Sequence, residues 1–314
     1  VAMTERADER DMMVKTVKLL SAGVEAPLVV DTTEYDVMKA ALENYPGRAI
    51  VNSINLENRA DRVDTWLPVI KEHGAAVVAM TIDETGMAKT AEKKLEVARR
   101  IYDVATKEYG LTAESLIFDP QVFPLVTGQE DLRDSAIQTI DGIRKIEAAL
   151  PGVMTLLGIS NVSFGVGPAA RKVLNSVFLY HTVEAGLDLA IVNAADVMPY
   201  AEIPEEQRVL ADDLIFNRRA DALQHFIEFY ESFTEEATAG GADPMDGMSA
   251  DERIHYQVLH RMKEGVEALL DQAIAERMGL DAAPGPADRP THDTTEAAVS
   301  VLNAVLLPAM KEVG

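Results

Sequence analysis

The sequence predicts an α/β fold built on a parallel sheet, and two recurring features support this class. Short apolar, β-branched runs are each followed by a longer segment whose apolar residues recur with helical spacing. Within the short runs the apolar residues are consecutive rather than alternating, which is typical of parallel strands buried on both faces. Regular alternation of strand and helix is the connection pattern of parallel α/β folds.

Six short runs of this kind occur, and each leads to a polar residue. They occupy residues 27–30, 49–51, 75–80, 116–118, 154–157 and 189–192. The polar residues at or just after their ends are Asp31, Asn52, Asp83, Asp119, Asn161 and Asn193.

The intervening segments have the apolar stripes of amphipathic helices. Residues 12–20 are helical in character, and a second stripe runs from Leu95 to Ala105 before Gly110 ends it. A third predicted helix follows Asp131, with isoleucine at every third position from 137 to 146.

Two closures of a parallel sheet are open at this point, a doubly wound sheet and a TIM (β/α)8 barrel. An open nucleotide-binding sheet usually carries a glycine-rich phosphate loop at its first βα turn, and this sequence has none there. Polar residues at strand ends are where barrel enzymes place their chemistry. We therefore expect a barrel that lacks its first two strands in this chain, because six strands are visible and eight are needed.

Beyond residue 201 the strand pattern stops, and a helical C-terminal segment is expected. Residues 205–233 read as one or two helices, and Ser249 with Glu252 forms a capping-box pattern that opens a helix extending to about Met278. A final helix is expected from about Thr295 to Glu312. The predicted divisions are a truncated barrel over 1–236, a linker over 237–248 and a truncated helical segment over 249–314.

Composition and charge exclude several classes of function. The chain has 29 Lys+Arg against 52 Asp+Glu, a net charge of −23, so nucleic acid is not an expected partner. It has no cysteine, which excludes disulfides, thiolate zinc sites and a cysteine nucleophile and fits a reducing cytoplasm. The histidines are scattered without paired spacing, so no metal site is expected. No apolar run reaches the roughly 18 residues of a membrane span, and the start at Val1 leads us to expect a piece of a longer protein.

Five segments at the strand ends resemble motifs of one family, in the same order. Residues 158–165 read Gly-Ile-Ser-Asn-Val-Ser-Phe-Gly, residues 31–33 Asp-Thr-Thr, and residues 50–54 Ile-Val-Asn-Ser-Ile. Residues 118–120 read Phe-Asp-Pro and residues 191–194 Ile-Val-Asn-Ala. These segments resemble the pterin-binding (methyltetrahydrofolate) domain of cobalamin-dependent methionine synthase. The C-terminal residues resemble the start of the helical cap that precedes its cobalamin domain.

The resemblance implies a pterin-binding TIM barrel that transfers a methyl group from 5-methyltetrahydrofolate to cob(I)alamin during methionine biosynthesis. It implies that the pterin is held by Asp31, Asn52 and Asp119, with Asn161 near N5 as the catalytic residue. Asp83, Arg171 and Asn193 match further family positions around the folate. Cobalamin would be bound by a downstream domain or a partner corrinoid protein, because this chain has no Asp-x-His-x-x-Gly motif.

The residue types suit this chemistry. Ionised Asp31 and Asp119 can only accept hydrogen bonds, whereas Asn52 can also donate, which matches the N–H, amino and carbonyl groups of a pterin edge. Methyl transfer from a tertiary amine requires protonation of N5 or a strong hydrogen bond to it. The amide of Asn161 can turn either its N–H or its carbonyl toward that atom.

Each of these residues also has a plainer interpretation. Asp31 could precede a helix cap, Asn52 could belong to a turn, and Asp119 could begin a loop. Asn161 could lie in a flexible turn, and Asn193 could cap the next helix. Two departures from the family pattern also matter, namely Gln121 where many members have asparagine, and the altered length of the loop at 165–168.

Two alternative functions remain open. One is a stand-alone methyltetrahydrofolate:corrinoid methyltransferase of one-carbon metabolism, which the long C-terminal tail disfavours. The other is a non-catalytic folate-binding module that docks a corrinoid protein. Dihydropteroate synthase, another pterin barrel, is disfavoured because its lysine and Ser-x-Arg features are not evident.

Overall fold

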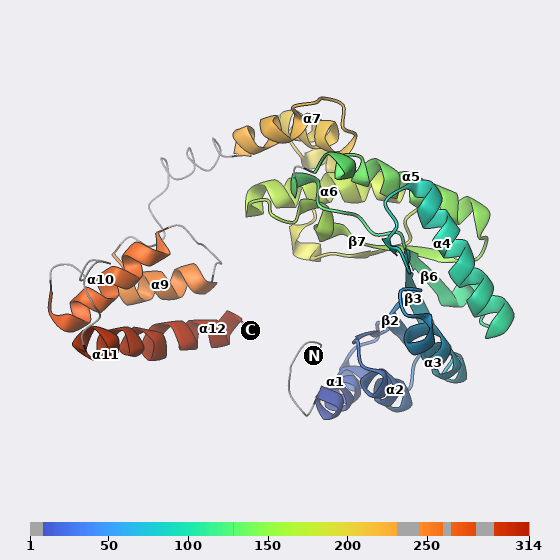
Figure 1. The fold of residues 1–314 in the computed structure, drawn as a ribbon, viewed down its shortest axis with the longest axis horizontal. Coiled ribbons are helices and arrows are strands. Elements are labelled where there is room, and N and C mark those ends of the chain that lie inside the picture. The colour runs from blue at the N-terminus through green and yellow to red at the C-terminus, as the bar shows by residue number, and fades with distance from the viewer. Residues whose placement is uncertain are drawn as a thin grey trace. The chain divides into compact units, whose positions relative to one another are not determined.

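The computed structural model describes residues 9–127, 129–230, 245, 247–259, 265–280 and 292–313. The chain forms two compact units, Val1–Glu231 and Ser232–Gly314. Among the described residues, every strand belongs to the first unit (Figure 1).

A six-stranded parallel sheet forms the centre of the first unit. Its neighbours, in order, are β1 (Val29–Asp31), β2 (Ile50–Ile54), β3 (Ala76–Met80), β6 (Leu116–Asp119), β7 (Met154–Gly158) and β8 (Leu189–Ile191). The strands follow chain order without reversal, whereas a doubly wound sheet reverses at a switch point. The expected α/β class and singly wound barrel type are therefore confirmed, and all six predicted strands are present.

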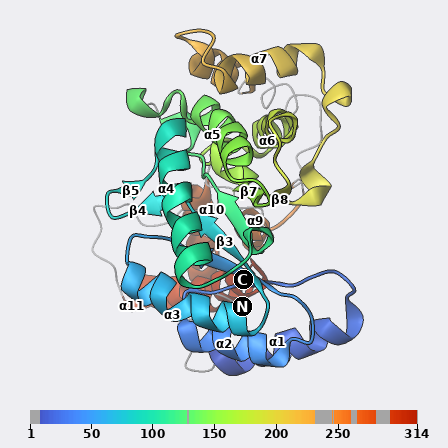
Figure 2. The same ribbon diagram turned by 90° about the vertical axis from the view of Figure 1, so that its right-hand side faces the viewer.

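Helices cover the convex side of the curved sheet (Figures 1 and 2). Along the chain the helices of this unit are α1 (Glu9–Gly23), α2 (Tyr35–Asn44), α3 (Arg59–Glu72), α4 (Ala91–Asp103), α5 (Ser135–Ala149), α6 (Pro168–Glu184) and α7 (Glu205–Ile215). Of these, α1 packs against α2, and α7 packs against α6. Residues 104–108 extend α4 as a π-helical turn, and residues 222–230 are helical. Gly110 ends the α4 segment with a φ of 67°, as its position in the sequence predicts.

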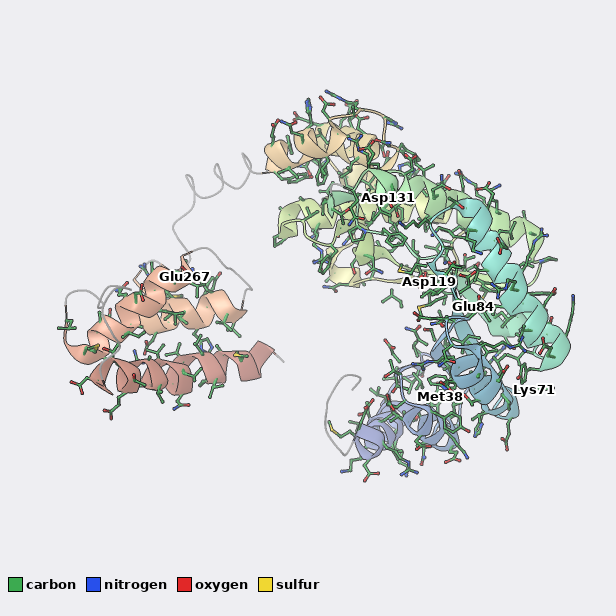
Figure 3. All side chains as sticks on the ribbon, viewed as in Figure 1. Met38, Lys71, Glu84, Asp119, Asp131 and Glu267 are labelled. Carbon is green, nitrogen blue, oxygen red and sulfur yellow. The ribbon has the colours of Figure 1, made fainter. Side chains whose placement is uncertain are left out.

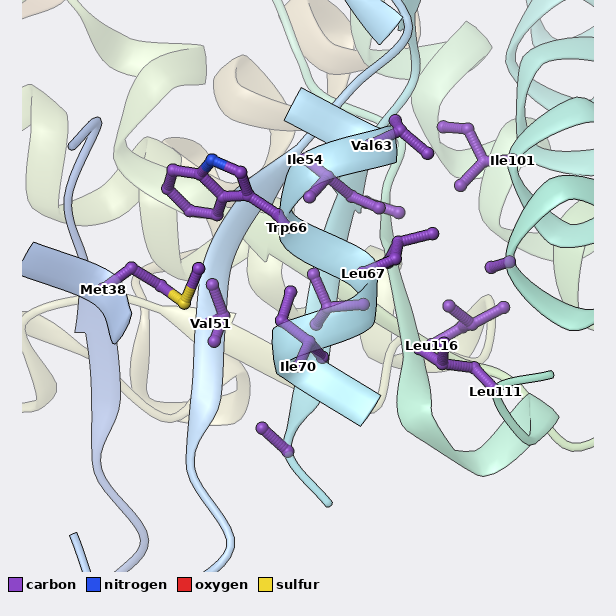
Figure 4. Close-up of a cluster of buried hydrophobic side chains, with 14 of the residues drawn as sticks. Met38, Val51, Ile54, Val63, Trp66, Leu67, Ile70, Ile101, Leu111 and Leu116 are labelled. Carbon is purple, nitrogen blue, oxygen red and sulfur yellow. The ribbon is translucent and has the colours of Figure 1, made fainter. Parts of the chain in front are cut away.

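The main core lies between the sheet and these helices. Trp66, Leu67 and Ile70 of α3 are almost fully buried and pack with Val51 of β2 and Met38 of α2 (Figure 4). A second cluster joins Leu157 of β7 to apolar residues of α5, α6 and α7. These clusters take up outward-facing residues of the first five strands of the sheet, such as Val30, Val77 and Leu157.

The residues that face inward form a separate apolar floor on the concave side of the sheet. It comprises Ile50, Ala76, Val78, Ile117, Met154, Leu156 and Leu189. Because side chains alternate between faces along a strand, the residue two positions after Ile50 also faces inward, and that residue is Asn52. By the same rule Asp119 follows Ile117. The concave face is therefore apolar in its floor and polar at the carboxyl ends of its strands.

A two-stranded hairpin that the sequence patterns do not reveal follows β3. It pairs β4 (Ile82–Asp83) with β5 (Gly86–Met87) in antiparallel fashion. Gly86 adopts a φ of 102° at its turn, a conformation that favours glycine.

The second unit is helical in its described residues. It contains α9 (Ala250–Leu259), α10 (Val266–Met278), α11 (His292–Val301), the π-helical turn Leu302–Leu306 and α12 (Leu307–Val313). Ser249 and Glu252 form the predicted capping box, in which each backbone N–H donates to the other residue's side chain at 2.8 and 3.3 Å. Arg277 makes a bidentate pair with Asp251 at 2.9 and 2.8 Å.

Three expectations for this part of the chain need comment. The single helix from residue 249 to 278 is wrong, because α9 and α10 are separate helices that contact each other and Gly265, with a φ of 74°, precedes α10. Most of the linker predicted over 237–248 lies outside the described residues, as do residues 281–291. The final helix is present and begins slightly earlier than predicted, at His292.

No helix in the described part of the chain is long and apolar enough to cross a membrane.

The burial of α3 leads to a first prediction. Leu67 is fully buried, so Leu67→Ala is expected to lower the free energy of unfolding by about 2–5 kcal/mol through lost apolar burial and a residual cavity. Leu19→Ala is the matched control, since Leu19 of α1 is 74% exposed, and it should change stability by less than about 0.5 kcal/mol. Urea denaturation of both variants measures the difference. Equal losses in the two would contradict the described packing of α3.

Candidate active site

The carboxyl ends of β1 and β2 place Asp31 and Asn52 side by side. The two residues are register partners in the parallel ladder, so their side chains project from the same face of adjacent strands, which lie about 4.8 Å apart. Asp31 is exposed and Asn52 is half-buried. Within the described ranges, neither side chain has a hydrogen-bond partner, which leaves both groups available to a ligand.

Thr32, not Asp31, holds the turn into α2. The Thr32 hydroxyl accepts a hydrogen bond from the backbone N–H of Glu34 at 3.2 Å and donates to Glu9 Oε1 of α1 at 3.2 Å. Asp31 precedes this turn, as its plainer interpretation expects, and its carboxylate makes no hydrogen bond within the turn.

Asp119 ends β6 on the same concave face (Figure 3). Its Oδ1 accepts a hydrogen bond from the backbone N–H of Gln121 at 2.7 Å. Surrounding protein raises the pKa of the Asp119 carboxyl from 3.8 to about 6, an effect that this hydrogen bond and the charge of Lys94 only partly offset. Part of the side chain nevertheless remains accessible. At neutral pH the group is an ionised acceptor with incomplete solvation.

Asn161 lies in the 3-10 turn Ile159–Ser163 that follows β7. The turn is anchored by the fully buried Ser163, whose hydroxyl lies 2.7 Å from Asn175 Oδ1 of α6. A β-carbon on Gly158 would lie 3.0 Å from the Asn161 amide nitrogen. Because Gly158 follows the inward-facing Leu156 by two residues, the Asn161 amide lies over the concave face, and its side chain is exposed.

Asp83 differs from the other predicted site residues, because its carboxylate is already engaged. The side chain is 1% exposed and accepts hydrogen bonds from the backbone N–H and the hydroxyl of Thr85 at 2.9 and 2.6 Å. It also pairs with Lys93 at 2.9 Å and Arg100 at 3.0 Å. The Thr85 hydroxyl, followed by Lys93, holds the pKa of Asp83 well below its usual range. These contacts support a structural role for Asp83 in the hairpin, and its contact with a pterin stays a prediction.

Asn193 and Arg171 lie at the edge of this group. Asn193 Oδ1 accepts a hydrogen bond from the N–H of Ala195 at 3.3 Å, so the capping interpretation is confirmed for this side chain. Arg171 is half-buried in the first turns of α6, and the described residues supply it with no carboxylate partner. A role for either residue in folate binding stays a prediction.

The structure adds Lys94 of α4, which the sequence analysis does not single out. Lys94 is 1% exposed and donates hydrogen bonds to the backbone carbonyls of Pro120 and Gln121, the latter at 2.9 Å. Burial lowers its pKa to about 8, so the ammonium is charged at neutral pH. One sequence signal could have revealed it, because Lys94 occupies a position on the apolar stripe of its helix, four residues before Ala98.

The arrangement suits recognition of a small polar ligand. Among the described residues, no group of three or more histidine, aspartate or glutamate side chains is placed to hold a metal ion. Asp31, Asn52, Asp119 and Asn161 instead present acceptors and amides above an apolar floor.

The raised pKa of Asp119 predicts a stability change that depends on pH. The folded state holds the Asp119 proton more tightly than the unfolded chain, so stability falls as pH rises from about 4 to 6. Asp119→Asn removes this cost and should stabilise the chain by on the order of 2 kcal/mol at pH 7 but little at pH 4. Thermal unfolding across this range measures it, with Asp36→Asn on an exposed part of α2 as the charge control. A uniform effect at both pH values would contradict the assignment.

The chain is similar to one protein family and to several known proteins. The chain matches the family described as "Pterin binding enzyme" over residues 1–193. It is 38% identical to the methionine synthases of Mycobacterium tuberculosis over 304 residues and Mycobacterium leprae over 295 residues. These alignments cover 94% and 92% of the chain but 24% and 23% of the relatives, so the chain spans about a quarter of their length.

Solved structures similar to this chain include a dihydropteroate synthase from Yersinia pestis with a pterine-sulfa conjugate. That structure is 16% identical, with a TM-score of 0.47, and the match covers 70% of this chain and 79% of the other. On the family match over residues 1–193, this chain belongs to the pterin-binding enzymes.

Proposed function

We propose that this chain binds 5-methyltetrahydrofolate and presents its methyl group to cob(I)alamin, as the folate half-reaction of methionine synthesis. The observation that carries the proposal is the set of polar side chains at the carboxyl ends of β1, β2, β6 and β7. Three of them, Asp31, Asn52 and Asn161, have no hydrogen-bond partner in the part of the chain that is described. The 38% identity to two methionine synthases supports the choice of reaction.

The pterin edge is held by Asp31, Asn52 and Asp119. The two carboxylates accept hydrogen bonds from the ring N–H and amino groups, and the Asn52 amide can serve both a donor and an acceptor on that edge. The apolar floor formed by Ile50, Val78 and Ile117 lies next to these groups and suits the flat face of the ring. Charged acceptors form stronger hydrogen bonds than neutral ones, so the carboxylates contribute most to orientation.

Asn161 acts on N5, the atom that releases the methyl group. Departure of the methyl requires that N5 carry a proton or a strong hydrogen bond. An exposed amide above the concave face can donate its N–H to an unprotonated N5 or accept from a protonated one. Cob(I)alamin, held by a downstream domain or a partner corrinoid protein, supplies the nucleophile, and this chain supplies orientation and hydrogen bonding.

The remaining family positions have peripheral roles in this proposal. Arg171 has no carboxylate partner among the described residues and is suited to the negatively charged tail of a folate. Asp83 stabilises the hairpin that follows β3. Asn193 stabilises the turn that follows β8 by capping it. A cytoplasmic location, consistent with the absence of cysteine, stays part of the proposal.

Methyl transfer to free cobalamin tests the proposal. Mixing the chain with 5-methyltetrahydrofolate and cob(I)alamin should convert the cob(I)alamin absorption spectrum to that of methylcobalamin. Binding of the folate without any methyl transfer would favour a non-catalytic folate-binding module. Transfer to a separate corrinoid protein but not to free cobalamin would favour the stand-alone methyltransferase.

Asn161→Ala should separate binding from chemistry. Removing the amide is expected to slow methyl transfer by about 10²-fold, by analogy with the loss of a transition-state hydrogen-bond donor. Folate affinity should stay within about 10-fold of wild type, because the pterin edge is held by other residues. Single-turnover transfer and equilibrium binding measure the two quantities. Asn44→Ala is the control, since Asn44 donates to Ala40 O at the far end of α2. Equal losses of rate and affinity would make Asn161 a binding residue only.

A further inference from the structure

The buried ammonium group of Lys94 supports the loop that follows β6. Lys94 of α4 directs its ammonium group at the backbone carbonyls of Pro120 and Gln121. Thr139 of α5 donates a hydrogen bond to the same Gln121 carbonyl at 2.7 Å. Two helices therefore fix the backbone directly beyond Asp119.

Space for the lysine is provided by Gly142 of α5. A β-carbon at that position would lie 2.8 Å from Lys94 Cδ, closer than real contacts allow. Glycine inside a helix costs about 1 kcal/mol relative to alanine. The position therefore accommodates the lysine at a cost to the helix itself.

The supported loop has a constrained conformation that orients the carboxylate of Asp119. Gln121 has a φ of 54°, which is uncommon for a residue other than glycine. Its N–H donates to Asp119 Oδ1 while its carbonyl accepts from Lys94 and Thr139. One peptide segment thus links the buried ammonium to the orientation of the carboxylate.

Lys94 is also the charge that acts on Asp119. The residue paired with Asp119 on β3 is Met80, and β7 presents Met154 and Leu156 to the same face, so the neighbouring strands supply no charge there. Burial raises the pKa of Asp119, and the attraction of Lys94 and the hydrogen bond from Gln121 N–H lower it. Without the ammonium, the carboxylate would take up its proton at a higher pH.

We propose that Lys94 is a positioning residue for the pterin site, because it fixes the loop that presents Asp119 and keeps that carboxylate ionised for ligand binding. This inference rests on the proposed function. It adds a pH dependence to pterin binding, in which affinity is lost as Asp119 becomes protonated.

The test compares Lys94→Met, Lys94→Gln and Thr139→Val in the full chain, with 5-methyltetrahydrofolate as the probe. Affinity is measured by calorimetry from pH 5 to 8. Lys94→Met should lose about 10-fold or more in affinity at pH 7.5, the size expected for a lost charge-assisted hydrogen bond. Its acid limb, meaning the part of the pH profile in which affinity falls as the pH is lowered, should shift to higher pH by on the order of one unit. Protonation of the probe itself is common to all variants and cancels in the comparison.

The other two variants separate charge from local support. Lys94→Gln keeps an N–H donor but no charge, so its acid limb should shift as in Lys94→Met while its affinity loss is smaller. Thr139→Val removes a hydrogen bond to the same Gln121 carbonyl without changing charge, so its acid limb should match wild type.

The measurements distinguish failure of the role assigned to Lys94 from failure of the proposed function. If the wild type binds the folate and both Lys94 variants keep its acid limb, the role assigned to Lys94 is overturned. If the wild type does not bind the folate at any pH, the proposed function itself fails.

Discussion

Alternation of side chains along parallel strands is the constraint on which the rest of the structure depends. Each strand sends one set of residues outward to the helices and the other inward to the concave face. The inward set begins with apolar residues such as Ile50 and Ile117 and continues, two residues later, with Asn52 and Asp119. Because the six strands are parallel and adjacent in chain order, their polar ends meet on one rim.

The polar rim has an energetic cost that the core must offset. Asp119 is partly removed from water, and Lys94 is almost wholly buried with two backbone carbonyls as its partners. Both groups would be more stable in solvent than in the apo fold, as the directions of their pKa shifts indicate. A pterin edge that donates hydrogen bonds to Asp119 would recover part of this cost, so ligand binding and stability are linked at the same carboxylate.

Much of the fold could be predicted from the sequence, because its signals are local. Consecutive apolar residues in each short run indicate buried strands, and stripes such as Leu95 to Ala105 indicate the helices. Asp31, Asn52 and Asp119 stand at strand ends and Asn161 follows β7 by three residues, so parallel order predicts that they lie near one another. Their assignment to a pterin site came from the resemblance to the family. The separation of α9 from α10 was missed because Gly265 reads as one tolerated glycine within a helical pattern.

The parts that were not predictable depend on tertiary contacts. Nothing local shows that Asp83 would be enclosed by Thr85, Lys93 and Arg100, since the hairpin that carries it has only two residues in each strand. The role of Lys94 requires a loop 26 residues further along the chain and a glycine on a neighbouring helix. Such contacts exist only after the sheet has curved and the helices have packed against it.

A crystal structure of the chain with bound 5-methyltetrahydrofolate would test the proposed site most directly. We expect the pterin on the concave face, with its pyrimidine edge hydrogen-bonded to Asp31, Asn52 and Asp119 and its N5 within reach of the Asn161 amide. A folate bound elsewhere on the chain, or bound with its pterin turned away from Asp119, would contradict it.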